Sequence, residues 1–321
     1  MAAGKAAPRP WAAALRRFAW RLLGGLGVLW GAATLTFLAL HLTGGDPALT
    51  ILGGEDATPS REALARVRAE YHLDQPLWYQ YTLYLARLAQ GDLGDSYRLR
   101  IPVTRAIAQQ IGATAQLAFW AATVAVLLSI TVAILTARQR PWIRSLVSGA
   151  ELVISSMPGF VIGIILLLVF AFQLKLLPAS GSAGWLSMVL PTITLALPIA
   201  AVLTQVLRQE LEDILEQPFI LTARARGMSE VGVRLRHALR HALIPLVTLS
   251  GFIVGSLLGG AVIAESLFAR QGIGRLMIDA TMNKDVPIVL GITLLSALVY
   301  VVINLVVDVL YTIIDPRLKG V

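Results

Sequence analysis

Two histidines are the first residues whose types and spacing could do chemistry. His237 and His241 lie four residues apart, which would place both imidazoles on one face of a helix, as in many metal sites. The glutamate of a His-Glu-x-x-His motif is missing, because the segment reads His-Ala-Leu-Arg-His. Arg236 and Arg240 flank the pair and would repel a cation. The pattern therefore favours a basic helix face over a metal site.

The chain offers no motif for nucleotide hydrolysis either. It contains no Gly-x-x-x-x-Gly-Lys-Ser/Thr sequence, the loop that holds phosphates in many ATPases. Gly272-Ile273-Gly274 is a weak phosphate signal by itself, and we expect a re-entrant or partner-facing turn there. No nucleophile and base are arranged as in an intramembrane protease. We expect no catalytic residue, no metal site and no cofactor bound by this chain.

The segment around Gly227 is better suited to contact than to catalysis. Pro218 predicts the start of a helix, Gly227 its end, and Ser229 the cap of a second helix. The second helix has an expected apolar stripe of Val231, Leu235, Ala238 and Leu239. This pattern predicts a knob that could enter a groove on a partner protein, although a solvated hairpin explains it equally well. The candidate contact residues are Thr222, Ala223, Arg224, Ala225, Arg226, Gly227 and Ser229, where small side chains at 222, 223 and 225 would allow close approach.

The elements that must position this knob are membrane spans. Apolar residues make up 56% of the chain, charged residues only 14%, and the mean hydropathy is +0.72, which excludes an ordinary soluble domain. A helix needs about 20 residues to cross the hydrocarbon core. Stretches without Asp, Glu, Lys or Arg that are long enough occur at 22–45, 106–137, 152–174, 176–207, 242–264 and 286–307. Backbone groups in lipid must be satisfied internally, so we predict an all-α protein with six transmembrane helices.

The positive charges predict the orientation of these spans. Lys and Arg are concentrated in the N-terminal tail, the second and fourth connectors and the C-terminal tail. Such residues favour the cytoplasmic side, so both termini and the loop 209–241 should be cytoplasmic. The net charge of +8 is explained by topology and lipid contact, and we expect no binding of nucleic acid. The apolar run that begins at Leu22 is too long for a cleaved signal peptide.

The first extracytoplasmic loop, 43–105, is long enough to fold. Thr58-Pro59 predicts one helix start, and Asp74-Gln75-Pro76 predicts another helix that ends at Gly91. A small cap without chemistry and a docking surface for an external partner both fit. Within the spans, Met157, Pro158 and Pro198 are candidate gate or path residues, since prolines can kink a helix there.

Several motifs together resemble one known family. The stretches Thr222 to Gly227 and Arg236 to Pro245 are similar to the coupling loop of ABC-importer permeases of the dipeptide/oligopeptide/nickel type. The same similarity is carried by Gly45-Asp46-Pro47, Leu73 to Leu77, Gly91 to Gly94 with Ser96, and Asp315 to Lys319. The long first loop resembles the first of the two permease subunits of such systems.

The resemblance implies a type I permease bundle in the bacterial cytoplasmic (inner) membrane. Its expected partners are a second, homologous permease, two cytoplasmic ABC ATPases that hold ATP and Mg, an extracytoplasmic substrate-binding protein and membrane lipid. The implied layout is a basic tail at 1–21, a first helix at 22–42, the loop at 43–105, a five-helix domain at 106–313 that contains the coupling loop 209–241, and a tail at 314–321.

The implied function is to form half of a translocation path for peptides or a related solute, such as glutathione, nickel or a metal chelate. Two other classes remain open. A secondary transporter driven by an ion gradient would need acids near the midplane or inverted repeats, neither of which stands out here. A membrane scaffold that transports nothing would not need a glycine-broken cytoplasmic knob.

Overall fold

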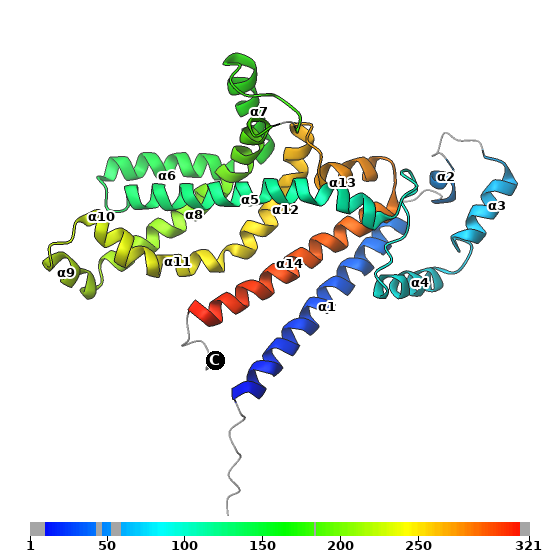
Figure 1. Ribbon diagram of the computed structural model, residues 1–321, viewed down its shortest axis with the longest axis horizontal. Helices are drawn as coiled ribbons and strands as arrows, with labels where there is room; N and C mark the ends of the chain where they lie inside the picture. The colour runs from blue at the N-terminus through cyan, green and yellow to red at the C-terminus, as the bar shows by residue number, and fades with distance from the viewer. Residues whose placement is uncertain (1–9, 43–46, 53–58, 183, 315–321) are drawn as a thin grey trace, which may run out of the picture. The chain divides into compact units, whose positions relative to one another are not determined.

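The computed structural model describes residues 10–42, 47–52, 59–182 and 184–314 (Figure 1). The described residues are largely helical, with an isolated antiparallel bridge between Asp95 and Pro102. The elements are α1 (Pro10–Leu42), α2 (Pro47–Ile51), α3 (Arg61–Glu70), α4 (Leu77–Ala89), α5 (Val103–Thr136), α6 (Pro141–Ser156), α7 (Gly159–Leu166), the π-helical η1 (Leu167–Gln173), α8 (Leu186–Leu215), α9 (Pro218–Ala225), α10 (Glu230–Val233), the π-helical η2 (Arg234–Ala238), α11 (Leu239–Thr248), α12 (Ser250–Leu267), α13 (Ile273–Met282) and α14 (Val286–Ile314).

Several of these helices are apolar and long enough to cross a membrane. Four of them, in the part of the chain that the structure describes, pass by length and composition at 19–39, 103–136, 186–215 and 286–307. The pair formed by α6 and α7–η1 passes together, although it is bent by 106°. The shorter helix at 251–267 is also apolar. Counting the bent pair and this helix as one span each gives the six spans that the sequence predicts.

Three expected spans differ from their sequence boundaries. In the fifth, expected at 242–264, α11 ends at Thr248 and α12 begins at Ser250. The stretch 152–174 is not one straight helix, because α6 ends before Met157-Pro158 and a new helix begins at Gly159. The fourth span begins at Leu186 rather than near residue 176. The intervening residues contain proline, glycine and serine, which favour turns over helix. Helix α8 then continues through Leu215, so the first residues of the predicted loop 209–241 are helical.

The chain divides into two compact units, and the first comprises residues 1–104 and 283–305. In this unit the Tyr81 hydroxyl lies 2.6 Å from the Thr34 hydroxyl, and the Phe37 ring packs on Tyr81 and Tyr84. Helix α4 is thereby fixed against the C-terminal half of α1. The predicted start at Asp74-Gln75-Pro76 is confirmed, since α4 begins at Leu77.

The other predicted helix start in this loop is displaced. Thr58 lies outside the described residues, and α3 begins at Arg61 with Ser60 as its cap. The Ser60 hydroxyl accepts a hydrogen bond from the Ala63 amide at 3.1 Å. A serine at this position satisfies an amide that the first helical turn leaves without a partner, so the cap lies two residues later than expected.

A buried carboxylate organises the end of the same loop. Asp285 is 2% exposed and accepts hydrogen bonds from the Ser96 hydroxyl and from the amides of Tyr97 and Arg98. These bonds join the segment after Gly94 to the start of α14. The motif from Gly91 to Ser96, which carries part of the resemblance described above, is thus held by Asp285, a residue far away in sequence.

The second unit, residues 105–282 and 306–321, is built around α8. Leu203, Leu207, Leu211 and Leu215 are fully buried on one face of α8 at helical spacing. The helix packs against α6, α7, α11 and α12 (Figure 1). Pro198 lies inside α8 without ending it, whereas Pro158 stands at a break between helices.

Candidate functional site

The turn at Gly227 has the geometry that the sequence predicts. Helix α9 runs from Pro218 to Ala225, and Gly227 follows with φ +78°. The amide of Gly227 donates to the Arg224 carbonyl at 2.9 Å, which closes the helix end. A side chain at this φ would be strained, although a Cβ on Gly227 would meet no atom within 4 Å. The predicted helix start, bend and stop are confirmed.

Helix α10, which follows the turn, is fixed to α9, which precedes it. The Ser229 hydroxyl accepts from the Gly232 amide at 3.2 Å and caps α10, as predicted. Arg224 donates through Nε and Nη2 to both oxygens of Glu230, at 2.8 and 3.2 Å. This hydrogen bond, together with the nearby charge of Arg224, Arg234 and Arg138, holds the pKa of Glu230 below its usual value. We call residues 218–233 the α9–α10 hairpin.

One face of the α9–α10 hairpin belongs to the core of its unit. Ile220, Ala223 and Val233 are buried in the main apolar cluster around α8. The Arg234 guanidinium donates to the Ile134 carbonyl at 2.8 Å, next to the end of α5. Ala223 therefore faces the core of its own unit, and of the three small residues at 222, 223 and 225 only Thr222 and Ala225 are exposed.

The opposite face is open and partly apolar. Thr222, Ala225 and Arg226 are exposed, and Leu221 is 64% exposed. The expected apolar stripe is wrong in register, because Val231 and Leu235 point outward. The exposed large apolar residues of this region are Phe219, Leu221, Val231 and Leu235. Exposed apolar groups beside charged ones are typical of a protein contact surface.

Ion pairs fix α8 near the hairpin. Glu151 and Arg208, both 7% exposed at the side chain, form a bidentate pair with two bonds of 2.7 Å, and Arg208 also donates to the Ser148 hydroxyl. Arg144 pairs with Glu212 and Arg138 with Glu216, each at 3.3 Å. Arg208 and Glu212 on α8 and Glu216 at its C-terminal cap are spaced by four residues and so lie on one face of the helix. The three pairs, one of them buried, join this face to α6 and to the turn before it.

The two histidines lie on α11 and on the π-helical segment before it. Among the described residues no group of three or more His, Cys, Asp or Glu side chains is placed to hold an ion. The His241 ring instead lies 5.7 Å from the Phe219 ring, centroid to centroid. Sequence reasoning left His241 on a basic face, and the structure adds an aromatic contact between α9 and α11.

The candidate gate residues lie in different settings. Met157 has extended backbone before Pro158, as expected of a residue that precedes proline, and the 106° bend follows there. Pro198 lies in the continuous α8. Met157 and Pro158 therefore lie at a bend between two helices, whereas Pro198 does not interrupt its helix.

A buried glutamate explains the Gly-x-Gly run. Glu265 is fully buried and accepts from the Thr114 hydroxyl at 2.6 Å and from the Gly274 and Arg275 amides at 2.8 and 3.2 Å. Gly272 and Gly274 are buried against α12, and a Cβ at 274 would lie 2.4 Å from the Val262 Cα. The run is the start of α13, where the Glu265 carboxylate accepts the amides. Its glycines face α12 rather than a partner, and the alternative of a re-entrant turn stays a prediction.

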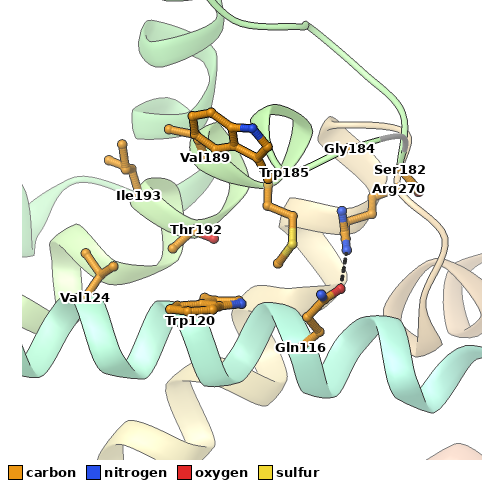
Figure 2. A pocket seen from close by; sticks show the side chains of 11 residues that line it. Gln116, Trp120, Val124, Ser182, Gly184, Trp185, Val189, Thr192, Ile193 and Arg270 are labelled. Carbon is orange, nitrogen blue, oxygen red and sulfur yellow. Dashed lines mark hydrogen bonds between the residues drawn. The ribbon is translucent and has the colours of Figure 1, made fainter.

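A cavity in the second unit was not anticipated from the sequence. It has a volume of about 800 Å³ and is lined mainly by α5, α8 and the connector before α8, with Trp120 and Trp185 in its wall (Figure 2). Arg270 also lines it and is 3% exposed. The spacing of Gln116 and Trp120 on one helix face was the available signal, but nothing local connected them to Arg270.

Comparison with known proteins gives consistent matches. The profile of a family described as "Binding-protein-dependent transport system inner membrane component" matches residues 125–320. A glutathione transport system permease protein, GsiC, of Escherichia coli O6:H1 is 38% identical over 300 residues, which cover 93% of this chain and 97% of that protein. The proteins of the same name from Salmonella typhimurium strain LT2 and Escherichia coli strain K12 are 38% and 37% identical, again over 93% of this chain and 97% of each relative.

Proposed function

Because the chain belongs to the family of binding-protein-dependent transport system inner membrane components, it is a permease subunit of an ABC importer, and we propose that the α9–α10 hairpin is the surface on which a separate ATPase acts. The subunit itself is not an enzyme, since ATP hydrolysis in such systems is carried by other subunits. Importers of this kind work with a partner permease, ATPases and a binding protein in general. The particular contacts described below belong to the proposal.

The observation that carries the coupling role is a fixed hairpin with an open face. Core residues hold one side, while Leu221, Thr222, Ala225 and Arg226 are free for a partner. The Arg224–Glu230 pair and the Ser229 cap keep the two arms at a set angle. A rigid hairpin transmits displacement to α8 and α11, which a loose loop would not. Transport needs two states that ATP-bound and ATP-free partners stabilise differently.

Orientation follows from the positive-inside rule. The α9–α10 hairpin, both chain termini and the turn before α6 would face the cytoplasm of a bacterial cell, where two ATPases hold ATP and Mg. The segment 43–105 and the connector before α8 would face outward, toward a substrate-binding protein. A second, homologous permease would complete the path, with Met157, Pro158 and Pro198 near its moving parts.

The substrate that the relatives favour is a short peptide-like solute. The similar proteins are named for glutathione, a tripeptide with free carboxylates. Near-complete coverage at 37–38% identity supports the same class of solute here. We therefore propose glutathione or another short peptide, with nickel and metal chelates less favoured.

Reconstitution tests this function against its rivals. The chain is co-reconstituted with its partner permease, ATPases and binding protein, and uptake of labelled glutathione is measured. We expect uptake to need ATP, to stop when the ATPase is inactivated, and to survive a proton uncoupler. Uptake that follows the uncoupler and ignores the ATPase would indicate a secondary transporter. Absence of uptake of any short peptide, with normal assembly, would favour a scaffold.

A further inference from the structure

We infer that the cavity between α5, α8 and Arg270 is a binding site for the carboxylate of the transported solute. This inference rests on the proposed function, because it assigns a place in this chain for a chemical group that short peptides carry. The cavity is named here the Arg270 cavity. Its principal residues are Gln116, Trp120, Trp185, Met188 and Arg270.

The size and lining of the Arg270 cavity suit a small solute. A volume of about 800 Å³ lies within the usual range for ligand pockets, which is roughly 300–1,000 Å³. Trp120 and Trp185 provide flat apolar surface, and Met188 and Val189 line the same space. Few polar groups are present, so those few would fix the orientation of a ligand. Figure 2 shows the Arg270 side chain directed at Gln116, across from the tryptophans.

Arg270 is the unusual member of this lining. It is a charged side chain that is 3% exposed, and its Nη2 atom donates to the Gln116 Oε1 atom at 3.3 Å. Its Nε and Nη1 atoms are buried and have no acceptor among the described residues. A buried guanidinium with one long bond is costly, because charge leaves water only when hydrogen bonds replace the lost hydration.

The nearest acid does not supply the missing bonds. Both Glu265 oxygens already accept from Thr114, Gly274 and Arg275. Those bonds hold the Glu265 carboxylate at the start of α13. The Arg270 amide donates to the Glu265 carbonyl at 2.8 Å, but among the described residues no hydrogen bond joins the Arg270 guanidinium to the Glu265 carboxylate. A planar guanidinium matches a carboxylate in bidentate geometry. The carboxylate of a bound solute would accept the hydrogen bonds that Arg270 Nε and Nη1 lack. Gln116 would bind a neighbouring amide of the solute.

A cysteine introduced into the cavity measures its charge preference directly. The chain has no cysteine, so Met188→Cys creates a single thiol in the lining. Its rates of reaction with anionic sulfonatoethyl and cationic trimethylammonioethyl thiosulfonates are compared in the assembled importer without ATP. A nearby fixed positive charge should raise the anionic-to-cationic rate ratio about tenfold over that of Ser180→Cys in the exposed connector.

Substitutions in the cavity then test whether Arg270 causes the increase in the anionic-to-cationic rate ratio. Arg270→Gln should abolish the increase, and Arg270→Lys should retain most of it. Gln116→Glu should also abolish it, because an acid beside the guanidinium occupies the same donors without removing the arginine. Arg275→Gln is the matched control, since Arg275 is exposed and outside the cavity lining, and its ratio should equal that of the parent.

Protection experiments identify the anion. Glutathione with its thiol blocked by S-methylation, so that it cannot consume the thiosulfonate reagent, should slow labelling of Met188→Cys at least several-fold. The diethyl ester of the same compound, which lacks free carboxylates, should not. Equal protection by both compounds, or an unchanged rate ratio in both Arg270→Gln and Gln116→Glu, overturns the inference. Protection by phosphatidylglycerol vesicles but not by glutathione assigns the cavity to lipid and overturns it too. Because labelling needs no ATP, a loss of ATP-driven uptake would count against the proposed function alone.

Discussion

At the scale of single residues, the same residue type serves quite different ends in this chain. Gly227 is needed for its φ of +78° in an open turn, whereas Gly274 is needed because no Cβ fits against the backbone of Val262. Arg224 closes a surface turn, whereas Arg208 is buried with Glu151. Conformation and burial therefore predict the effect of a substitution better than residue type does.

Gly227→Leu should leave the protein folded and abolish transport. The open space around its Cβ position leaves only backbone strain, which is roughly 1 kcal/mol. A leucine at the tip of a hairpin that enters a partner groove would prevent close packing. We expect normal membrane abundance, weak co-purification of the ATPase and no uptake.

Gly91→Leu is the matched control for this change. Gly91 has a similar φ of +76° and equally open surroundings, but it lies in the predicted extracytoplasmic loop. The strain is the same, so this variant should retain the ATPase. Normal uptake by Gly227→Leu would show that the turn is not the coupling contact.

The buried pair of Glu151 and Arg208 should matter much more to stability than the exposed pairs. Glu151→Gln leaves a buried guanidinium without its counter-charge, which typically costs about 3–5 kcal/mol. Arg144→Gln breaks a pair whose arginine is 56% exposed and should cost less than about 1 kcal/mol. Thermal unfolding in detergent measures both, and the double change Glu151→Leu with Arg208→Met should recover most of the loss.

At the scale of elements, the sequence predicted what depends on local chemistry. The α9–α10 hairpin follows from Pro218, Gly227 and Ser229, which act on their own backbone, and each acts as expected. The apolar stripe was placed wrongly because Val231 and Leu235 fit a helical period that the core does not use. Contacts between distant segments, such as Asp285 with Ser96 and Arg270 with Gln116, carry no local signal and could not be predicted.

The contact of α12 with α13 gives a prediction at this scale. A Cβ at Gly274 would meet backbone atoms of Val262, so the two helices would have to move apart. Forced overpacking typically costs 1–3 kcal/mol. We expect Gly274→Ala to lower the midpoint of thermal unfolding and the yield. Gly149→Ala, where a Cβ would meet no atom within 4 Å, serves as the control and should change neither. An unchanged midpoint in Gly274→Ala would mean that the helices are not held this closely.

At the scale of the whole molecule, composition and charge already define a membrane protein of many spans. The bend within the third apolar stretch was harder to predict. The helices on either side of Met157-Pro158 meet at 106°, and this dipeptide is the local sequence signal for the bend. Orientation remains a prediction from the positive-inside rule, and it decides whether the α9–α10 hairpin and the Arg270 cavity can work together. Coupling requires the hairpin on the ATP side, and delivery requires the cavity near the opposite side.

Cysteine labelling in intact cells tests this arrangement. Because the parent chain has no cysteine, a single one can be placed at Ser180, at Arg140 or at Gly227, all exposed positions. A membrane-impermeant maleimide should label Ser180→Cys from outside, and Gly54→Cys as well, at a position outside the described residues. Arg140→Cys and Gly227→Cys should react only after the inner face is opened, for example in everted vesicles. External labelling at 227 would place the hairpin away from ATP, and a surface that no ATPase can reach cannot couple hydrolysis to transport.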